Sequence, residues 1–387
     1  MTHSSIDFGL PSDTGGKDLG IFTPMANGGW ILSNNAPTLD GSYAYNREVA
    51  RLAESFGYDF VMSMAKWRGY GGPRRHWQST LDASLLMAAV AEATSRVKVW
   101  TTIHTLLQNP AVAAKMIATL DHISGGRAGL NIVTGSYKDE FGQMGAWREG
   151  VDHDQRYDLA TEWIQCIKRL WSEPSVTHEG TYFQLRDCQS DPKPLSLPRP
   201  FLVCAGLSER GMRFTAEEAD AIFLTGKDNA GMKENSLKMK EMASRHGRRL
   251  RTYTYITLVL GESDEKAQAA ACHYRAGFDE EAFRGMMRAY GFLDAELGKE
   301  NDFVAASRSA FMTPYLIGSP KSVSEQLTSL LEEAQLDGAM LIFPDYLAGM
   351  TLFAEGAMPQ VRAHFAAPAD GAGRAGRARS LSRGWNP

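Results

Sequence analysis

Short apolar segments alternate with helix-like segments along most of this 387-residue chain, and this alternation restricts the fold more than any other feature. The apolar segments are rich in Val, Ile, Leu and Phe, as expected for strands that are covered on both faces. Strands that alternate with helices indicate βα units and a parallel sheet. We expect eight strands, at residues 19–22, 60–64, 97–102, 127–133, 198–205, 219–224, 253–260 and 338–343.

The helix expected at residues 110–123 shows how the chain marks its elements. Asn109 is a favourable N-cap, and Pro110 suits the first helical position because it has no N–H to satisfy. Gly125 and Gly126 can supply the left-handed residue that ends the helix. A hairpin with its turn at Glu179-Gly180 is expected before the fifth strand.

Two long segments without a clear strand pattern follow the fourth and the seventh strands, and we expect insertions there. The second of them, residues 276–314, has weak periodicity and is interpreted as a flexible insertion or lid. We expect a flexible N-terminus at residues 1–17, a single domain at 18–365 and a disordered basic tail at 366–387.

Composition and motif searches exclude several classes of function. The net charge of −4 offers no basic field for nucleic acid or a membrane surface, and no apolar segment is long enough for a membrane span. The start of the chain lacks the apolar core of a signal peptide, so we expect a cytoplasmic protein. The four cysteines show no C-x-x-C spacing, so we expect reduced thiols and no metal site. The G-x-G-x-x-G pattern at 371–376 follows no strand and is rejected as a dinucleotide site.

Polar side chains stand where several of the expected strands end, which is where barrels of βα units carry their chemistry. Lys66, Thr102, Asn131 and Ser208 follow or end four different strands, so closure of the sheet would bring them to one face. Asn131 interrupts an apolar strand, and burying its amide is costly unless the amide is hydrogen-bonded. It is therefore either a satisfied core residue or a group directed at a ligand.

Arg156, Tyr157 and Ser208 lie at the starts of two expected helices. An arginine and a helix N-terminus suit an anionic phosphate group. The alternatives are that Arg156 pairs with Asp152 or Asp154 and that Ser208 is only an N-cap.

Several motifs in the same order resemble the bacterial luciferase-like, flavin-dependent monooxygenases, and most of all their pyrimidine monooxygenase branch. The main one is Ser-Gly-Gly-Arg-x-Gly-x-Asn-x-Val-Thr-Gly at 124–135, and others lie at 20–33, 59–69, 156–158 and 204–208. The resemblance covers residues 19 to about 226. It implies a (β/α)8 TIM barrel with insertions after strands 4 and 7, and a homo-oligomer, because the family usually forms dimers or tetramers.

The resemblance also implies the cofactor, the oxidant and the residues of the site. Thr102 and Asn131 match the positions that hold O2 against reduced flavin, and a hydroxyl and an amide can hydrogen-bond charge that develops on oxygen. Contacts to FMN carry over to Ala65, Lys66, Asn131, Glu140, Arg156, Tyr157 and Ser208. For the substrate we expect contacts from Trp30, Met64, His104 and Ser136, although His104 can equally be a paired structural histidine.

One departure from the pyrimidine branch bears on the substrate. That branch has Trp after Val-Thr-Gly, whereas this chain has Ser136 and Tyr137, and we expect a wider pocket. A pteridine or an isoalloxazine-type ring such as riboflavin then becomes a candidate beside a pyrimidine.

The resulting hypothesis is a two-component monooxygenase that opens a small N-heterocycle. The missing nicotinamide fingerprint implies that a separate NAD(P)H-dependent flavin reductase supplies reduced FMN. The alternatives are a sulfone monooxygenase, a deazaflavin-dependent dehydrogenase and a non-catalytic flavin-binding protein. A (β/α)8 hydrolase has less support, because no paired carboxylates stand at the strand ends.

Overall fold

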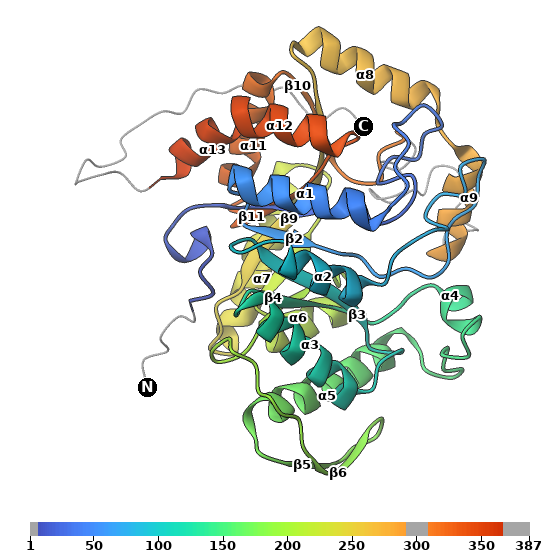
Figure 1. Cartoon of the computed structure of the whole chain (residues 1–387), viewed down its shortest axis with the longest axis vertical. Helices are drawn as coiled ribbons and strands as arrows, with labels where there is room; N and C mark the ends of the chain where they lie inside the picture. The colour runs from blue at the N-terminus through green and yellow to red at the C-terminus, as the bar shows by residue number, and fades with distance from the viewer. Residues whose placement is uncertain (1–6, 292–308, 367–387) are drawn as a thin grey trace.

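Parallel strands form a closed barrel inside a layer of helices in the computed structural model, which describes residues 7–291 and 309–366 (Figure 1). Within the described residues nine strands share one sheet, and eight of them close into the barrel because β8 also pairs with β9. In order around the barrel these eight are β1 (Asp18–Phe22), β2 (Phe60–Met62), β3 (Lys98–His104), β4 (Ala128–Val133), β7 (Phe201–Cys204), β8 (Ala221–Leu224), β9 (Arg251–Leu260) and β11 (Gly338–Ile342). The predicted (β/α)8 barrel is confirmed, and each of the eight predicted strands contributes one barrel strand.

The covering helices begin and end largely where local signals predict. Asn109 caps α3, and its side chain accepts a hydrogen bond from the N–H of Ala111, while Gly125 ends this helix with a φ of 66°. The helices that cover the barrel are α1 (Tyr43–Phe56), α2 (Ala83–Glu92), α3 (Pro110–Ser124), α5 (His153–Ser172), α6 (Glu209–Glu218), α7 (Asn229–Arg245), α11 (Pro320–Glu333), α12 (Tyr346–Gly356) and α13 (Met358–Phe365).

Both predicted insertions are present. After β4 the chain forms the short helix α4 (Lys138–Gly142) before α5, and an antiparallel hairpin of β5 (Val176–Glu179) and β6 (Gln184–Cys188) follows α5. After β9 it forms α8 (Asp264–Ala276) and α9 (Glu280–Ala289), and later β10 (Tyr315–Gly318). Figure 1 shows the hairpin projecting from the end of the molecule opposite to α8.

Two details of the second insertion differ from the prediction. Residues 276–314 are predicted to be a flexible insertion or lid, but residues 280–289 form α9, which buries Phe283, Met286 and Met287, and residues 292–308 of this segment lie outside the described residues. The strand β10 was not predicted at all. It has only four residues and pairs in parallel with the last part of β9, from Thr257, which is also the last residue of β9 that pairs with β11, to Leu260.

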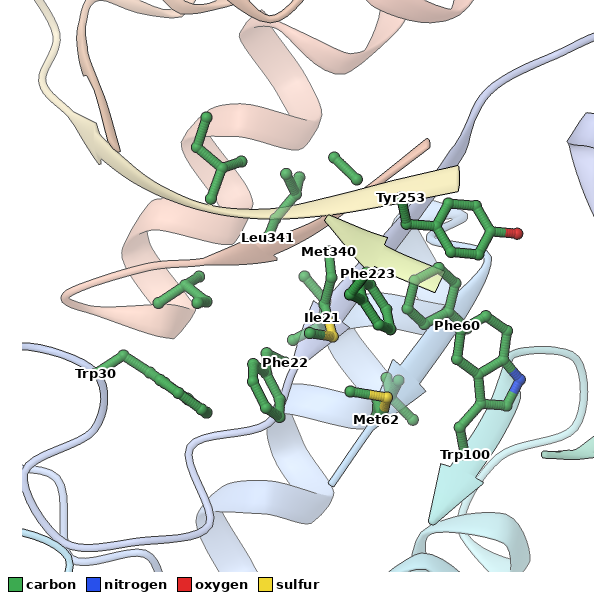
Figure 2. Close-up of a cluster of buried hydrophobic side chains, with 14 of the residues drawn as sticks. Ile21, Phe22, Trp30, Phe60, Met62, Trp100, Phe223, Tyr253, Met340 and Leu341 are labelled. Atoms are coloured by element: carbon green, nitrogen blue, oxygen red, sulfur yellow. The ribbon is translucent and has the colours of Figure 1, made fainter. Parts of the chain in front are cut away.

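The interior of the barrel is filled by large side chains that face small residues on neighbouring strands (Figure 2). The rings of Phe60 and Trp100 stack with their centroids 3.9 Å apart, and Tyr253 lies about 6 Å from both. A Cβ at Gly20 would lie 2.1 Å from Phe60, and one at Gly129 would lie 2.3 Å from Trp100, so these two glycines make room for the rings. The barrel is therefore closed below its upper rim, and ligands must bind at the C-terminal ends of the strands.

The two ends of the chain were predicted to be flexible or disordered. Part of the first segment is packed in the structure: Leu10 and Ser12 are buried, and the Ser12 hydroxyl donates to Asp18 at 2.8 Å. The predicted tail lies outside the described residues except for Ala366. Within residues 7–291 and 309–366, no helix combines the length and the apolar character that a membrane span requires.

Candidate active site

Thr102 and Asn131 form the centre of the site, inside the barrel and above Trp100. Side chains alternate along a strand, so Thr102 faces the interior like Trp100, and Asn131 faces it like Gly129. The two residues are register partners on β3 and β4. The Asn131 amide nitrogen donates to Thr102 Oγ1 at 3.0 Å, and the Thr102 hydroxyl donates to the carbonyl oxygen of Ser63.

These bonds fix the roles of both groups. Thr102 has one proton, which it gives to Ser63, so its oxygen can only accept from Asn131. A reversed Asn131 amide would place two acceptor oxygens against each other. Asn131 therefore keeps a second N–H for a ligand, and its Oδ1 is buried without a partner among the described residues. The hydrogen bond to Thr102 fixes the orientation of the Asn131 amide.

A buried ion pair holds the loop that follows β2. The Glu140 carboxylate accepts from Lys66 Nζ at 3.1 Å and from the backbone N–H groups of Trp67 and Arg68 at 2.7 and 3.2 Å. The side chains of Lys66 and Glu140 are 9% and 3% exposed. Burial lowers the pKa of Lys66, against the opposing effect of Glu140. This carboxylate thus positions the loop and its ammonium group.

Rings enclose the Lys66 ammonium on two further sides. Its Nζ lies 4.8 Å from the ring centroid of Tyr70 and 4.7 Å from that of Tyr137, in cation–π geometry. The Tyr70 hydroxyl lies 3.0 Å from that of Tyr290, just after α9, so the second insertion reaches the rim of the site. Motif comparison missed these three tyrosines, although Tyr137 lies beside the predicted Ser136.

Tyr157 and Ser208 are brought together at a second position on the rim. Burial raises the pKa of Tyr157 to about 12, although side-chain hydrogen bonds with Thr134 and Ser208 act in the opposite direction. A Cβ at Gly206 would lie 2.4 Å from the Tyr157 hydroxyl, and one at Gly211 would lie 2.6 Å from it. Only glycines allow the start of α6 to approach this phenol so closely. Ser208 is also the N-cap of α6 and accepts from the Gly211 N–H.

Two arginines beside Tyr157 have hydrogen-bond donors that are not used. The Nε of Arg156 and the Nη1 of Arg210 are buried and have no partner among the described residues. Arg156 makes neither of the two ion pairs considered from the sequence; it donates to the Val151 carbonyl and stacks over Trp147. Arg210 was not predicted, and it also pairs with Asp158 at 2.7 Å. Unpaired donors at a helix N-terminus suit a phosphate.

The four residues expected to contact the substrate differ in their surroundings, and their contact with a substrate stays a prediction. Met64 and His104 are buried at the ends of β2 and β3, and His104 Nε2 lies 3.2 Å from the carbonyl oxygen of Ala65. Trp30 packs on Phe22, with ring centroids 4.0 Å apart. Ser136 is exposed, and the adjacent Tyr137 places its ring at the site.

The other parts of the described chain contain no metal site, but they do contain two cavities. No group of three or more His, Cys, Asp or Glu residues there could hold a metal ion, and the four cysteines are free. A cavity of about 550 Å³ lies beside α1, and one of about 230 Å³ lies under the barrel around Lys98 and Phe201. Neither cavity is lined by the rim residues above.

Comparisons with known proteins agree with this geometry. A family model described as luciferase-like monooxygenase matches residues 18–338. Pyrimidine monooxygenase RutA from Methylobacterium radiotolerans is 36% identical over 354 residues, which cover 89% of this chain and 91% of that protein. RutA from Escherichia coli O8 is 35% identical over 359 residues, with coverages of 90% and 93%.

Solved structures share the fold at lower identity. A long-chain alkane monooxygenase, LadA, superposes with a TM-score of 0.80 at 21% identity and covers 92% of this chain and 93% of its own. Riboflavin lyase RcaE, solved with modified FMN and riboflavin, has the same TM-score and identity, with coverages of 91% and 94%.

Proposed function

The chain belongs to the luciferase-like monooxygenase family and is a flavin-dependent monooxygenase, and we propose that it uses FMN, reduced by a separate flavin reductase, to oxygenate a small N-heterocycle. Relatives named pyrimidine monooxygenase support the substrate class, because they match about nine-tenths of this chain. The single structural observation that carries the proposal is the Thr102–Asn131 pair, which leaves an amide N–H and an unpaired carbonyl oxygen at the inner mouth of the barrel.

The residues at the rim fit FMN. Unused donors on Arg156 and Arg210, the hydroxyls of Tyr157 and Ser208 and the closely packed Gly206 would hold its phosphate. When bound, reduced FMN supplies the electrons that activate O2. The Lys66 ammonium, held by Glu140, would lie beside the ring system.

The remaining tasks fall to side chains of this chain. Asn131 donates its second N–H to the oxygen that gains negative charge, and Thr102 keeps the amide in that orientation. The buried apolar side chains of Trp30 and Met64 would help to exclude water from the reacting oxygen.

Isotope tracing tests this function. The protein is supplied with chemically reduced FMN, 18O2 and a panel of uracil, lumazine and riboflavin, and the products are analysed by mass spectrometry. One 18O atom in a ring-derived product is expected. Absence of label from every product, with FMN retained, would favour the non-catalytic flavin-binding alternative and refute oxygenation.

A further inference from the structure

His104 is buried at the site, and one of its ring nitrogens makes a hydrogen bond while the other has no partner among the described residues. It lies on the same inward face of β3 as Trp100 and Thr102, at the C-terminal end of the strand, and it is 6% exposed. Its ring lies between Phe141 and Trp67, at centroid distances of 5.0 and 5.6 Å. The imidazole is therefore held in one place by neighbouring rings.

The hydrogen bond to Ala65 fixes the tautomer of His104. A backbone carbonyl oxygen can only accept, so the Nε2 that lies 3.2 Å from the Ala65 oxygen carries the proton. Nδ1 then has a lone pair and no proton, and it is buried without a partner among the described residues. A buried acceptor without a donor is costly, which points to a donor brought by a ligand.

The charge state agrees with an acceptor role. Burial lowers the pKa of His104 to about 4, and the nearby Lys66 ammonium lowers it further. The hydrogen bond to Ala65 and the negative charge of Glu140 act in the opposite direction. At neutral pH the imidazole is uncharged, and it is too weak a base to remove a proton from a lactam. It can accept a hydrogen bond without taking the proton.

We propose that His104 Nδ1 accepts a hydrogen bond from a ring N–H of the substrate and so selects lactam or imide rings over their N-alkylated analogues. The inference rests on the proposed function because it takes the substrate to be an N-heterocycle bound beside Asn131. It names the chemical group that the ring must present, an N–H next to a carbonyl, whatever the size of the ring. His104 is in this account a specificity-determining residue.

Two substitutions test the roles of the two ring nitrogens of His104 separately. In His104→Gln the side-chain amide can reach the position of Nε2 and donate to Ala65, but no acceptor remains at Nδ1. In His104→Asn the shorter side chain can place its oxygen near Nδ1, while the bond to Ala65 is lost. The two variants have similar polarity, so a general effect on folding would affect both.

Binding constants provide a test that does not depend on turnover. The FMN-loaded wild type and both variants are titrated by calorimetry with uracil, 1-methyluracil, 3-methyluracil, lumazine and 3-methyllumazine. For the wild type we expect at least one parent ring to bind about 10- to 100-fold more tightly than one of its methyl derivatives, the range expected when a buried acceptor loses its donor. His104→Gln should lose this ratio, and His104→Asn should keep most of it.

A nuclear magnetic resonance experiment observes the hydrogen bond directly. In 15N-histidine-labelled protein at pH 7, the assigned His104 Nδ1 should have the shift of an unprotonated nitrogen and should move when the preferred parent ring is added. The inference is overturned if Nδ1 is protonated, if no ring binds, if methylation has no effect, or if His104→Gln keeps the wild-type ratio. Failure of the proposed function has a different signature, since rings would bind with the expected preference but no 18O would enter a product.

Discussion

Replacing Thr102 with valine removes one hydroxyl and leaves the volume of the side chain nearly unchanged. In the structure this hydroxyl makes two buried hydrogen bonds, one donated to the Ser63 carbonyl and one accepted from the Asn131 amide. Each of the two groups left unpaired costs about 1–3 kcal/mol, so Thr102→Val should lower the free energy of unfolding by about 2–6 kcal/mol. Denaturant titration of wild type and variant measures this difference.

The same substitution should separate cofactor binding from oxygen transfer. Thr102 contacts none of Arg156, Tyr157 or Ser208, so the FMN dissociation constant should change less than about threefold. Without Thr102 the Asn131 amide can rotate, and the yield of 18O-labelled product should fall on the order of 100-fold, the typical effect of losing one donor to developing charge. Flavin fluorescence and mass spectrometry give the two values.

Two further variants make this prediction specific. Thr102→Ser keeps the hydroxyl and should retain most of the oxygenation. The double variant Thr102→Val/Asn131→Ala should be no worse than Asn131→Ala alone, because Thr102 acts through Asn131. Wild-type yield of labelled product in Thr102→Val, or fully additive losses in the double variant, would refute the reasoning.

Three other perturbations test separate parts of the site. Gly206→Ala places a Cβ 2.4 Å from the Tyr157 hydroxyl and should weaken FMN binding at least about tenfold in a fluorescence titration; an unchanged affinity would remove Gly206 from the phosphate site. Glu140→Gln leaves the Lys66 ammonium buried without its partner and should cost about 3–5 kcal/mol of stability in denaturant titration, whereas a loss below about 1 kcal/mol would mean that the ion pair is dispensable. Burial lowers the pKa of His104 to about 4 in the folded protein, against 6.5 in the unfolded chain, so protonation favours the unfolded chain. As the pH falls from about 6.5 to 4, the free energy of unfolding of wild type should therefore decrease by up to about 3 kcal/mol relative to that of His104→Gln. A difference between the two proteins that does not change with pH would contradict this.

Matched substitutions control for general effects. Gly231→Ala adds a Cβ whose nearest neighbour is 3.5 Å away, and it should leave FMN affinity unchanged. Glu149→Gln breaks the exposed pair with Lys138, whose side chains are 75% and 61% exposed, and it should cost less than about 1 kcal/mol.

The barrel strands could be predicted because each is a short apolar run buried on both faces, as the fully buried β8 illustrates. The strand β10 could not, since its four residues pair only with an extension of β9 and carry no pattern of their own. The helix α9 did have a signal. Asp279 is its N-cap, and Phe283, Met286 and Met287 form an apolar side, but Gly285 in the middle obscured it. That glycine is required because a Cβ there would lie 1.8 Å from the Tyr70 carbonyl oxygen.

The motifs predicted which strand ends meet but not what each side chain does there. That Thr102 and Asn131 hold O2 stays a prediction, and the structure adds what the motifs did not contain: the Thr102 hydroxyl donates to Ser63 and accepts from Asn131. Arg210 was missed because its use depends on a contact with Tyr157, far away in the sequence. The direction of a hydrogen bond and the packing of distant segments depend on three-dimensional positions that no local pattern contains.

The central claim is that the Asn131 amide on the fourth barrel strand donates a hydrogen bond to the oxygen that gains negative charge while a heterocycle is oxygenated. The most direct test is the amount of 18O-labelled product formed by FMN-saturated Asn131→Ala and by wild type under the same 18O2 supply. The account predicts labelled product from wild type and a loss on the order of 100-fold in the variant, with FMN affinity changed much less. Equal labelling of both products, or a loss explained entirely by weaker FMN binding, would contradict it.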